Sequence, residues 1–238
     1  LIIQGSATKP VYLWINDEQV RIKSASQMWG KDSYVATELI REDLKEPKAS
    51  VAAIGQAGEK EVAIANIVVD KHSFAGRCGL GAVMGSKNLK GIAVRGTKNI
   101  EVSNPNRVRE LVRNLGKKVA KNASGLRKYG TPGEIPKVNK QGDWPVKYWS
   151  EDYWDEGAIK LSGTRYQEEL TRKPVPCANC VIACHRDIEV KVPEKFSVAG
   201  AGPEFEALGM LGSCNLVSDL KAIAKANDLC NRYGIDVV

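Results

Sequence analysis

Three cysteines stand close together in the chain, and their chemistry suggests a metal centre. Cys177, Cys180 and Cys184 are separated by two and three residues. Thiolates are the preferred ligands of zinc and of iron–sulfur clusters, and this spacing can aim three sulfurs at one point. Zinc sites often use two separated pairs, and the sequence has no second Cys-x-x-Cys or His-x₃-His pair. The residues favour an iron–sulfur cluster, with a fourth ligand from elsewhere, and leave zinc and the absence of any metal as alternatives.

A glycine-rich stretch is the second candidate. Between Phe74 and Asn88 glycine occurs at positions 76, 79, 81 and 85. Glycines let the backbone approach a phosphate closely, and the N-terminus of a following helix attracts anions. Arg77 and Lys87 add positive charge beside this stretch. The pattern is neither a P-loop nor a G-x-G-x-x-G fingerprint, so a plain tight turn is an equal alternative.

Two carboxylates follow the thiols in the sequence Gly202-Pro-Glu-Phe-Glu206. Glutamates at a helix start are usually surface residues favoured by the helix dipole, so position alone assigns them no catalytic role. Cys214 and Cys230 lie on apolar helical sides, which is typical of core residues. Cys78, beside the glycines, fits either role.

The elements that must position these residues fall into two parts. Before residue 102 the patterns predict an α+β arrangement with a hairpin, short strands and short helices. The expected strands are 11–15, 20–22, 51–54 and 89–94, with an apolar run at 62–69 and a helix at 33–45. Asp32 is the expected N-cap of that helix, with Val35, Leu39 and Leu44 on its apolar side.

The second part is predicted to be mainly α-helical. Helices are expected at 105–121, at 204–211, and from a cap at Ser218 to Tyr233, with Gly234 as the C′ residue. Residues 122–161 hold three of the five tryptophans and are expected to be ordered but irregular. The predicted domains are 1–102 and 103–238. The chain has no initiator Met and begins on an apparent strand, so we expect an internal segment of a longer polypeptide.

Composition limits the classes of protein. The chain has 238 residues, 43% of them hydrophobic and 26% charged, and a net charge of +7. No apolar run is long enough for a membrane span. The basic residues are scattered, which is typical of a solvated surface. Six cysteines are too few for a disulfide scaffold, so the clustered thiols suggest a reducing compartment, and we expect the cytoplasm.

Together these motifs resemble a known family. The stretch from Ala75 to Val94, the Cys177-x₂-Cys-x₃-Cys184 motif and the segment from Gly202 to Glu206 occur in the order found in the tungsten-containing aldehyde:ferredoxin oxidoreductase family. The helix 219–236 extends the resemblance, and Gly125 to Thr131 adds a weaker match. The resemblance covers essentially the whole chain.

The resemblance implies a tungsten bis-pyranopterin cofactor beside a [4Fe–4S] cluster. By this resemblance 1–102 is the C-terminal portion of the pterin-binding domain, and 103–238 begins the helical domain that carries the cluster cysteines. It assigns Cys177, Cys180 and Cys184 to the cluster and places the fourth cysteine beyond Val238. The Phe74 carbonyl would help bind a Mg²⁺ between the pterin phosphates. The residues implied to bind the cofactor are Ser73, Phe74, Ala75, Gly76, Arg77, Gly79, Asn231, Gly234, Ile235 and Asp236.

Several residues depart from the family pattern. Ser73 replaces the usual Arg, and Asn231 replaces the first Asp of the Asp-x-x-Gly-Leu-Asp motif. Phe205 stands where the aldehyde oxidoreductases have Tyr. Glu206 matches the active-site glutamate, and the active-site His is expected outside the segment. Lys225-Ala-Asn-Asp228 replaces a Glu-x-x-His that binds a bridging metal in some members, so we do not expect that metal.

The resemblance predicts oxidation of an aldehyde to a carboxylic acid, with electrons passed to ferredoxin or to a partner iron–sulfur subunit. It also implies an anaerobic oligomeric enzyme with no nucleic-acid partner. The first alternative is the tungsten subunit of a benzoyl-CoA-reductase-type complex. The alternative from another class is a zinc-stabilised nucleic-acid-binding module, and metal analysis separates these readings.

Overall fold

A computed structural model describes residues 1–238, and they divide into two units. Unit 1 consists of Leu1–Asn99 and Leu229–Asp236, and unit 2 of Ile100–Asp228 and Val237–Val238. The last helix therefore contributes its final turn and the residues after it to unit 1. Each unit has its own buried core and is described by itself.

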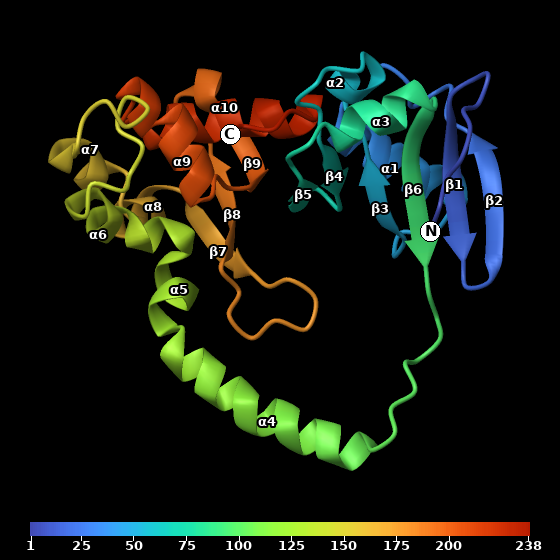
Figure 1. The fold of residues 1–238 in the computed structure, drawn as a ribbon, viewed down its shortest axis with the longest axis horizontal. Helices are drawn as coiled ribbons and strands as arrows, with labels where there is room; N and C mark the ends of the chain where they lie inside the picture. Colours follow the sequence, from blue (N-terminus) through green and yellow to red (C-terminus); the bar gives the residue numbers. More distant parts are fainter. The chain divides into compact units, whose positions relative to one another are not determined.

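Unit 1 is built on one six-stranded sheet with the order β2-β1-β6-β3-β4-β5 (Figure 1). The strands are β1 Val11–Asn16, β2 Gln19–Ser24, β3 Ser50–Ala53, β4 Ile67–Val69, β5 Ser73–Ala75 and β6 Leu89–Arg95. Strands β1 and β6 are parallel, and every other neighbouring pair is antiparallel. The hairpin and the strands near 51–54 and 89–94 agree with the sequence analysis. The apolar run 62–69 is a strand only over its last three residues.

Helices cover both faces of this sheet because the side chains of a strand alternate between its faces. Tyr12 of β1 packs in a core with α1 Ser33–Leu44, whereas its neighbour Leu13 packs in a second core with α3 Leu80–Ser86. The short helix α2 Gln56–Glu59 follows β3.

Helix α1 begins where the sequence predicted, because the Asp32 carboxylate accepts hydrogen bonds from the backbone N–H groups of Tyr34 and Val35. Leu39 and Leu44 pack against the core as predicted, but Val35 does not. Val35 is 40% exposed, and the buried residues are Ser33, Tyr34, Ala36, Thr37 and Ile40. The prediction was wrong for Val35, because its neighbours Ser33 and Tyr34 are the inward-facing residues and find polar partners inside the unit.

Unit 2 is mainly helical, as predicted. Its helices and 3₁₀ turns are α4 Pro105–Asn122, α5 Ser124–Tyr129, η1 Thr131–Glu134, α6 Ile135–Lys140, α7 Asp155–Lys160, α8 Gly163–Glu169, η2 Glu194–Phe196, α9 Phe205–Leu211, η3 Ser213–Asn215 and α10 Leu220–Tyr233. The stretch 122–161 thus contains several short helices and is less irregular than expected. Trp144 is fully buried there and stacks on Trp154, with 6.3 Å between the ring centroids.

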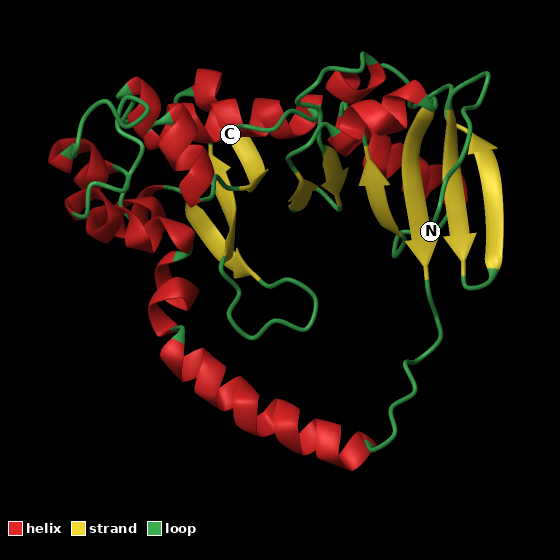
Figure 2. Cartoon of the chain, viewed as in Figure 1, coloured by secondary structure: helices red, strands yellow, loops and turns green.

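The sequence analysis missed a three-stranded antiparallel sheet in unit 2, with the order β7-β8-β9. Its strands are β7 Thr171–Val175, β8 His185–Val190 and β9 Val198–Ala201. The loop between β7 and β8 carries the three clustered cysteines and extends away from the sheet (Figure 2). Asp219, and not Ser218, caps α10, because its Oδ1 accepts from the N–H groups of Lys221 and Ala222. None of the helices is long and apolar enough to span a bilayer.

Candidate functional site

The segment 73–77 is an edge strand that ends in an open turn. Strand β5 pairs only with β4, and Ser73, Phe74 and Arg77 are exposed to solvent. The turn before it has two consecutive residues with positive φ, Asp70 at 49° and Lys71 at 65°. Two such residues are the signature of a tight hairpin connection, which glycine usually occupies. The edge position leaves backbone groups of 73–77 facing solvent.

The segment 231–236 begins inside the last turn of α10 and then pairs with residues 64–66. Gly234 has a φ of 76°, as expected for the C′ residue that ends a helix. The Asn66 N–H donates to the Gly234 carbonyl at 2.8 Å, and the Asp236 N–H donates to the Ile64 carbonyl at 3.0 Å. Ile235 forms a β-bridge with Ala65 between them. The chain end therefore runs beside the residues that lead into β4.

The structure brings these two segments together, although more than 150 positions separate them in the sequence. Arg77 Nε lies 3.4 Å from Asp236 Oδ2, and a Cβ on Gly76 would lie 3.4 Å from Asp236 Oδ1. Gly76 therefore borders the carboxylate without being crowded by it. The structure therefore places Gly76 and Arg77 of the first motif beside Asp236 of the second, whereas the predicted residues Gly79, Asn231 and Gly234 are buried.

Gly81 and Gly85 of the same stretch serve the fold. A Cβ on Gly85 would stand 1.8 Å from the Gly58 carbonyl oxygen, and one on Gly81 would stand 2.4 Å from that of Asn66. Their absent side chains allow α3 to approach α2 and the 65–66 backbone. The Gly81 N–H donates to the Ala65 carbonyl, so this amide at the start of α3 is used internally. Gly79 is the left-handed N-cap of α3, with a φ of 65°.

The cysteine loop in unit 2 is a series of tight turns. The Cys180 N–H donates to the Cys177 carbonyl at 3.1 Å, and Asn179 and Ala183 adopt positive φ. The Ile182 N–H lies 3.4 Å from Cys180 Sγ, and hydrogen bonds from the N–H groups of Ile182 and Ala183 lower the pKa of the Cys180 thiol. Such N–H donors favour a thiolate, which is the form that binds metal.

The three thiols differ in solvent exposure. Their sulfur atoms do not converge to metal-binding geometry. Cys177 is exposed, whereas Cys180 and Cys184 are half-buried. Burial, followed by the negative charge of Glu204, raises the pKa of the Cys184 thiol. No group of three or more His, Cys, Asp or Glu side chains converges to metal-binding geometry anywhere in the structure. The metal role of the three thiols therefore stays a prediction.

A buried arginine holds the end of this loop. Arg186 is 3% exposed, and its Nη1 donates to the carbonyls of Ala183, Cys184 and His185 at 2.9, 3.1 and 3.0 Å. Its Nη2 donates to the carbonyl of Arg127, in the last turn of α5, at 2.7 Å. One guanidinium thus ties the Cys184 backbone to a helix about 60 positions earlier. Sequence reasoning missed Arg186, because its position two residues after the last thiol was the only signal.

The two downstream carboxylates occupy different environments. Glu206 is exposed in the first turn of α9. Glu204 is the N-cap residue of α9, and its carboxylate accepts a 2.5 Å hydrogen bond from the Thr131 hydroxyl, which itself accepts from the Phe205 N–H. Burial raises the pKa of the Glu204 carboxyl. Glu204 Oε1 also lies 3.6 Å from His185 Nδ1, so the start of α9 contacts the residue beside Cys184.

Comparison with known proteins identifies the family. The family model described as "Aldehyde ferredoxin oxidoreductase, N-terminal domain" matches residues 1–96. The family model described as "Aldehyde ferredoxin oxidoreductase, domains 2 & 3" matches residues 110–238. The chain belongs to the aldehyde ferredoxin oxidoreductase family. The resemblance drawn from the motifs is therefore confirmed.

Curated relatives align with all or nearly all of the chain. The tungsten-containing aldehyde ferredoxin oxidoreductase of Pyrococcus furiosus is 35% identical over 241 residues, and that of Pyrococcus horikoshii is 36% identical over 242. The chain spans 39% of the length of each. The aliphatic sulfonate oxidoreductase WOR-like subunit of Pyrococcus furiosus is 27% identical over 251 residues, with 99% of this chain and 40% of that protein covered.

A solved structure supports the same fold. The active-site complex BamBC of benzoyl coenzyme A reductase with 1,5-dienoyl-CoA matches with a TM-score of 0.77 and 27% identity. The match covers 98% of this chain and 37% of that chain. The predicted fold class, a β-sheet part with short helices followed by a helical part, is confirmed.

Because the family includes tungsten-containing enzymes, it implies a tungsten–pterin cofactor for this chain. The chemistry of the side chains around Gly76 fits such a group. Arg77 supplies a cation for phosphate, and the Asp236 carboxylate can accept from ring N–H donors. The Asn66 side-chain oxygen is buried without a hydrogen-bond partner, beside Gly234, where a Cβ would lie 3.5 Å from it. An unpaired buried acceptor is costly, so a donor at this place would be stabilising.

Proposed function

We propose that the protein is a tungsten-dependent oxidoreductase that converts an aldehyde and water into a carboxylic acid, two protons and two electrons. The observation that carries the proposal is the contact between the two predicted cofactor segments, Arg77 with Asp236 at 3.4 Å and Gly76 beside the same carboxylate. Membership of the aldehyde ferredoxin oxidoreductase family supports this reaction class.

We assign cofactor binding to the two segments of unit 1. Ser73, Phe74, Ala75, Gly76, Arg77 and Gly79 would hold the pterin phosphates and their Mg²⁺, and Asn231, Gly234, Ile235 and Asp236 would hold the pterin rings. When bound, the tungsten–pterin group supplies the two-electron acceptor for the substrate. The Arg77 guanidinium would neutralise phosphate, and the Asn66 oxygen and Asp236 carboxylate would orient N–H donors.

In unit 2 we assign Cys177, Cys180 and Cys184 to a [4Fe–4S] cluster that passes electrons singly to ferredoxin or to a partner iron–sulfur subunit. The donor set supports this assignment, because N–H groups aimed at Cys180 Sγ stabilise a thiolate. Arg186 would keep the Cys184 backbone in place as the cluster changes charge. We expect the enzyme to act as an oligomer in the cytoplasm.

Glu206 is the proposed proton-handling residue. It stands in the first turn of α9, exposed to solvent, and Glu204 and Thr131 fix the start of that helix. A carboxylate in this place can take a proton from water as the substrate is oxidised.

The Glu206→Gln variant tests this assignment. We expect kcat to fall by roughly 10²–10⁴-fold with tungsten and iron contents unchanged. The assay is aldehyde-dependent viologen reduction, with metals measured by mass spectrometry. Glu168→Gln, which changes an exposed glutamate of α8, is the matched control and should keep wild-type kcat. A Glu206→Gln enzyme with wild-type kcat would refute the role of Glu206.

The structural match to benzoyl coenzyme A reductase favours a second candidate, the reduction of an aromatic ring carried by coenzyme A. Phe205 is consistent with a different substrate, since it removes the phenolic donor expected from the aldehyde oxidoreductases. Turnover of simple aldehydes by the wild-type enzyme supports the first proposal. Activity with dienoyl-CoA or benzoyl-CoA, and none with aldehydes, would replace it by the second.

A further inference from the structure

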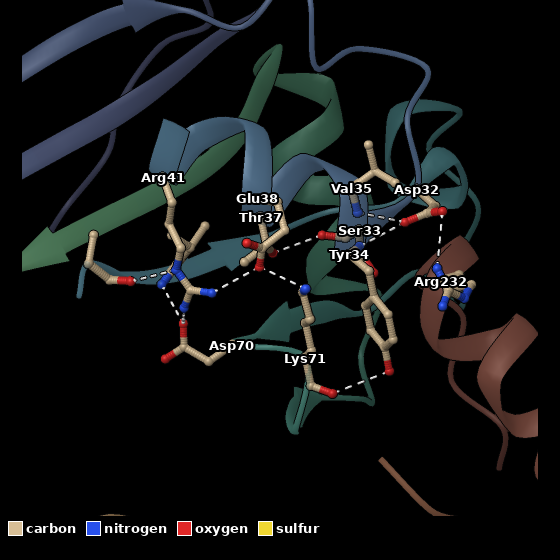
Figure 3. A network of polar contacts seen from close by, with 12 residues as sticks. Asp32, Ser33, Tyr34, Val35, Thr37, Glu38, Arg41, Asp70, Lys71 and Arg232 are labelled. Carbon is tan, nitrogen blue, oxygen red and sulfur yellow. Dashed lines mark hydrogen bonds and ion pairs between the residues drawn. The ribbon is translucent and has the colours of Figure 1, made fainter. Parts of the chain in front are cut away.

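The first turn of α1 contacts the segment 231–236 and the turn 70–72 that leads into the segment 73–77, although none of its residues belongs to either motif. Figure 3 shows Asp32, Ser33 and Tyr34 at this helix start, with Arg232 of α10 on one side and Lys71 of the β4–β5 turn on the other. All of these residues lie in unit 1. Ser33 and Tyr34 are buried, with exposures of 0% and 6%.

Three contacts join the helix start to the segment 231–236. The Ser33 hydroxyl donates to the Asn231 carbonyl at 2.8 Å. Arg232 Nη1 lies 3.5 Å from Asp32 Oδ2, and its guanidinium carbon lies 4.8 Å from the centroid of the Tyr34 ring. A buried hydrogen bond, an ion pair and a cation–π contact therefore fix the last turn of α10 against α1.

A second group of contacts joins the same helix to the turn before Ser73. The Tyr34 hydroxyl donates to the Lys71 carbonyl at 3.2 Å, and Lys71 Nζ lies 6.0 Å from the Tyr34 ring centroid. Lys71 Nζ also lies 2.7 Å from Glu38 Oε1, one turn further along the helix. Asp70 and Lys71 adopt positive φ without being glycine, and such a conformation persists only where surrounding contacts impose it.

Tyr34 thus contacts the segment 231–236 through its ring on Arg232, and through its hydroxyl on Lys71 it contacts the turn that leads into the segment 73–77 (Figure 3). The direct pair between the segments, Arg77 with Asp236, is weak support because Arg77 is 64% exposed. We propose that the first turn of α1 is a positioning element for the cofactor site, and that Tyr34 sets the spacing between the two segments. This inference rests on the proposed function and deepens it.

The test compares Tyr34→Leu and Tyr34→Phe in the purified holoenzyme. Leucine loses the hydroxyl and the ring, whereas phenylalanine keeps the ring on Arg232. We expect pterin and tungsten retained after gel filtration to fall about tenfold in Tyr34→Leu, and to recover by at least half in Tyr34→Phe. Hydrogen exchange should quicken about tenfold in residues 70–77 and 231–236 of Tyr34→Leu and stay unchanged in β1.

Tyr12→Phe is the matched control. Tyr12 is also buried, donates its hydroxyl to Asp43 near the other end of α1, and has Lys23 Nζ 5.8 Å from its ring centroid. It contacts neither segment through these bonds, so this variant should keep wild-type cofactor content. Wild-type cofactor retention and exchange in Tyr34→Leu would overturn the inference, and so would equal cofactor loss in Tyr12→Phe.

The two proposals fail in distinguishable ways. A wild-type enzyme without pterin or tungsten refutes the proposed function, and the positioning of the two segments is then judged by hydrogen exchange alone. If Tyr34→Leu does not fold, Tyr34→Phe decides, because loss of the Lys71 contact should quicken exchange in 70–77 more than in 231–236. Equal hydrogen-exchange rates in the two segments of Tyr34→Phe, or rates no faster than those of the wild type, would overturn the positioning role.

Discussion

Replacing Arg186 should destabilise unit 2 and loosen the cysteine loop. Its guanidinium donates to four backbone carbonyls while being 3% exposed. A hydrogen bond from a charged group contributes about 1.5–3 kcal/mol net, and the three bonds that share Nη1 count for less than three separate ones. Arg186→Met therefore should lower the free energy of unfolding by about 4 kcal/mol. Arg186→Lys keeps a cation, but one ammonium group cannot reach both the loop carbonyls and the Arg127 carbonyl. The free energy of unfolding should therefore fall by about 2 kcal/mol.

Urea unfolding followed by tryptophan fluorescence measures this loss, because the buried Trp144 and its partner Trp154 report on the core of unit 2. The corresponding fall in melting temperature is about 3 °C for each kcal/mol in a unit of this size. Cys184 should also react faster with a thiol reagent in the metal-free protein. The control is Arg165→Met, which removes an arginine with a half-exposed side chain from α8 and should cost no more than about 0.5 kcal/mol.

If the urea-unfolding midpoint of Arg186→Met equals that of the Arg165→Met control, the reasoning is refuted. It would mean that the four carbonyls find other donors, or that the loop contributes nothing to the stability of unit 2. A lower midpoint with unchanged Cys184 reactivity would assign Arg186 to the stability of the unit and not to the shape of the loop.

Two further predictions concern unit 1. Gly85→Ala should lower the free energy of unfolding by roughly 3 kcal/mol, because the added Cβ would lie 1.8 Å from the Gly58 carbonyl oxygen. Gly76→Ala should change the free energy of unfolding by no more than about 1 kcal/mol. Equal melting temperatures of the two variants would contradict this prediction. Hydrogen bonds from Lys23 and, to a smaller extent, from Tyr12 lower the pKa of the Asp43 carboxyl below its ordinary 3.8. The contribution of this carboxylate to the free energy of unfolding is therefore complete above pH 3.8 and is lost as the pH falls through the lowered pKa. The stability difference between wild type and Asp43→Asn should therefore shrink from pH 5 to pH 2 in urea titrations, and a constant difference would contradict the assignment.

The elements with strong local signals could be predicted from the sequence. The hairpin at 11–24 and the helix capped by Asp32 follow from alternation, turn residues and a capping side chain. The final helix ending at Gly234 and the amphipathic helix α4 follow in the same way. These signals act over a few residues, so a single chain segment carries them whatever its surroundings.

The short strands of unit 2 had no such signal. Strand β7 contains Pro174 and exposed basic residues, and it exists because β8 pairs with it across the cysteine loop. Val35 failed as a core residue for a similar reason: in the first turn of α1 the buried residues are Ser33 and Tyr34, which donate to the Asn231 and Lys71 carbonyls, and Val35 is left exposed.

By itself the sequence determined the motif set, and through it the family, because residue type and spacing are local properties. The tertiary structure alone decided which glycines border an open surface and which pack against backbone, and that Gly76 lies beside Asp236. It also decided that Arg186 holds the Cys184 backbone and that Tyr34 joins two distant segments. These are contacts between residues far apart in the chain, and only the folded backbone sets the distances on which hydrogen bonds and ion pairs depend.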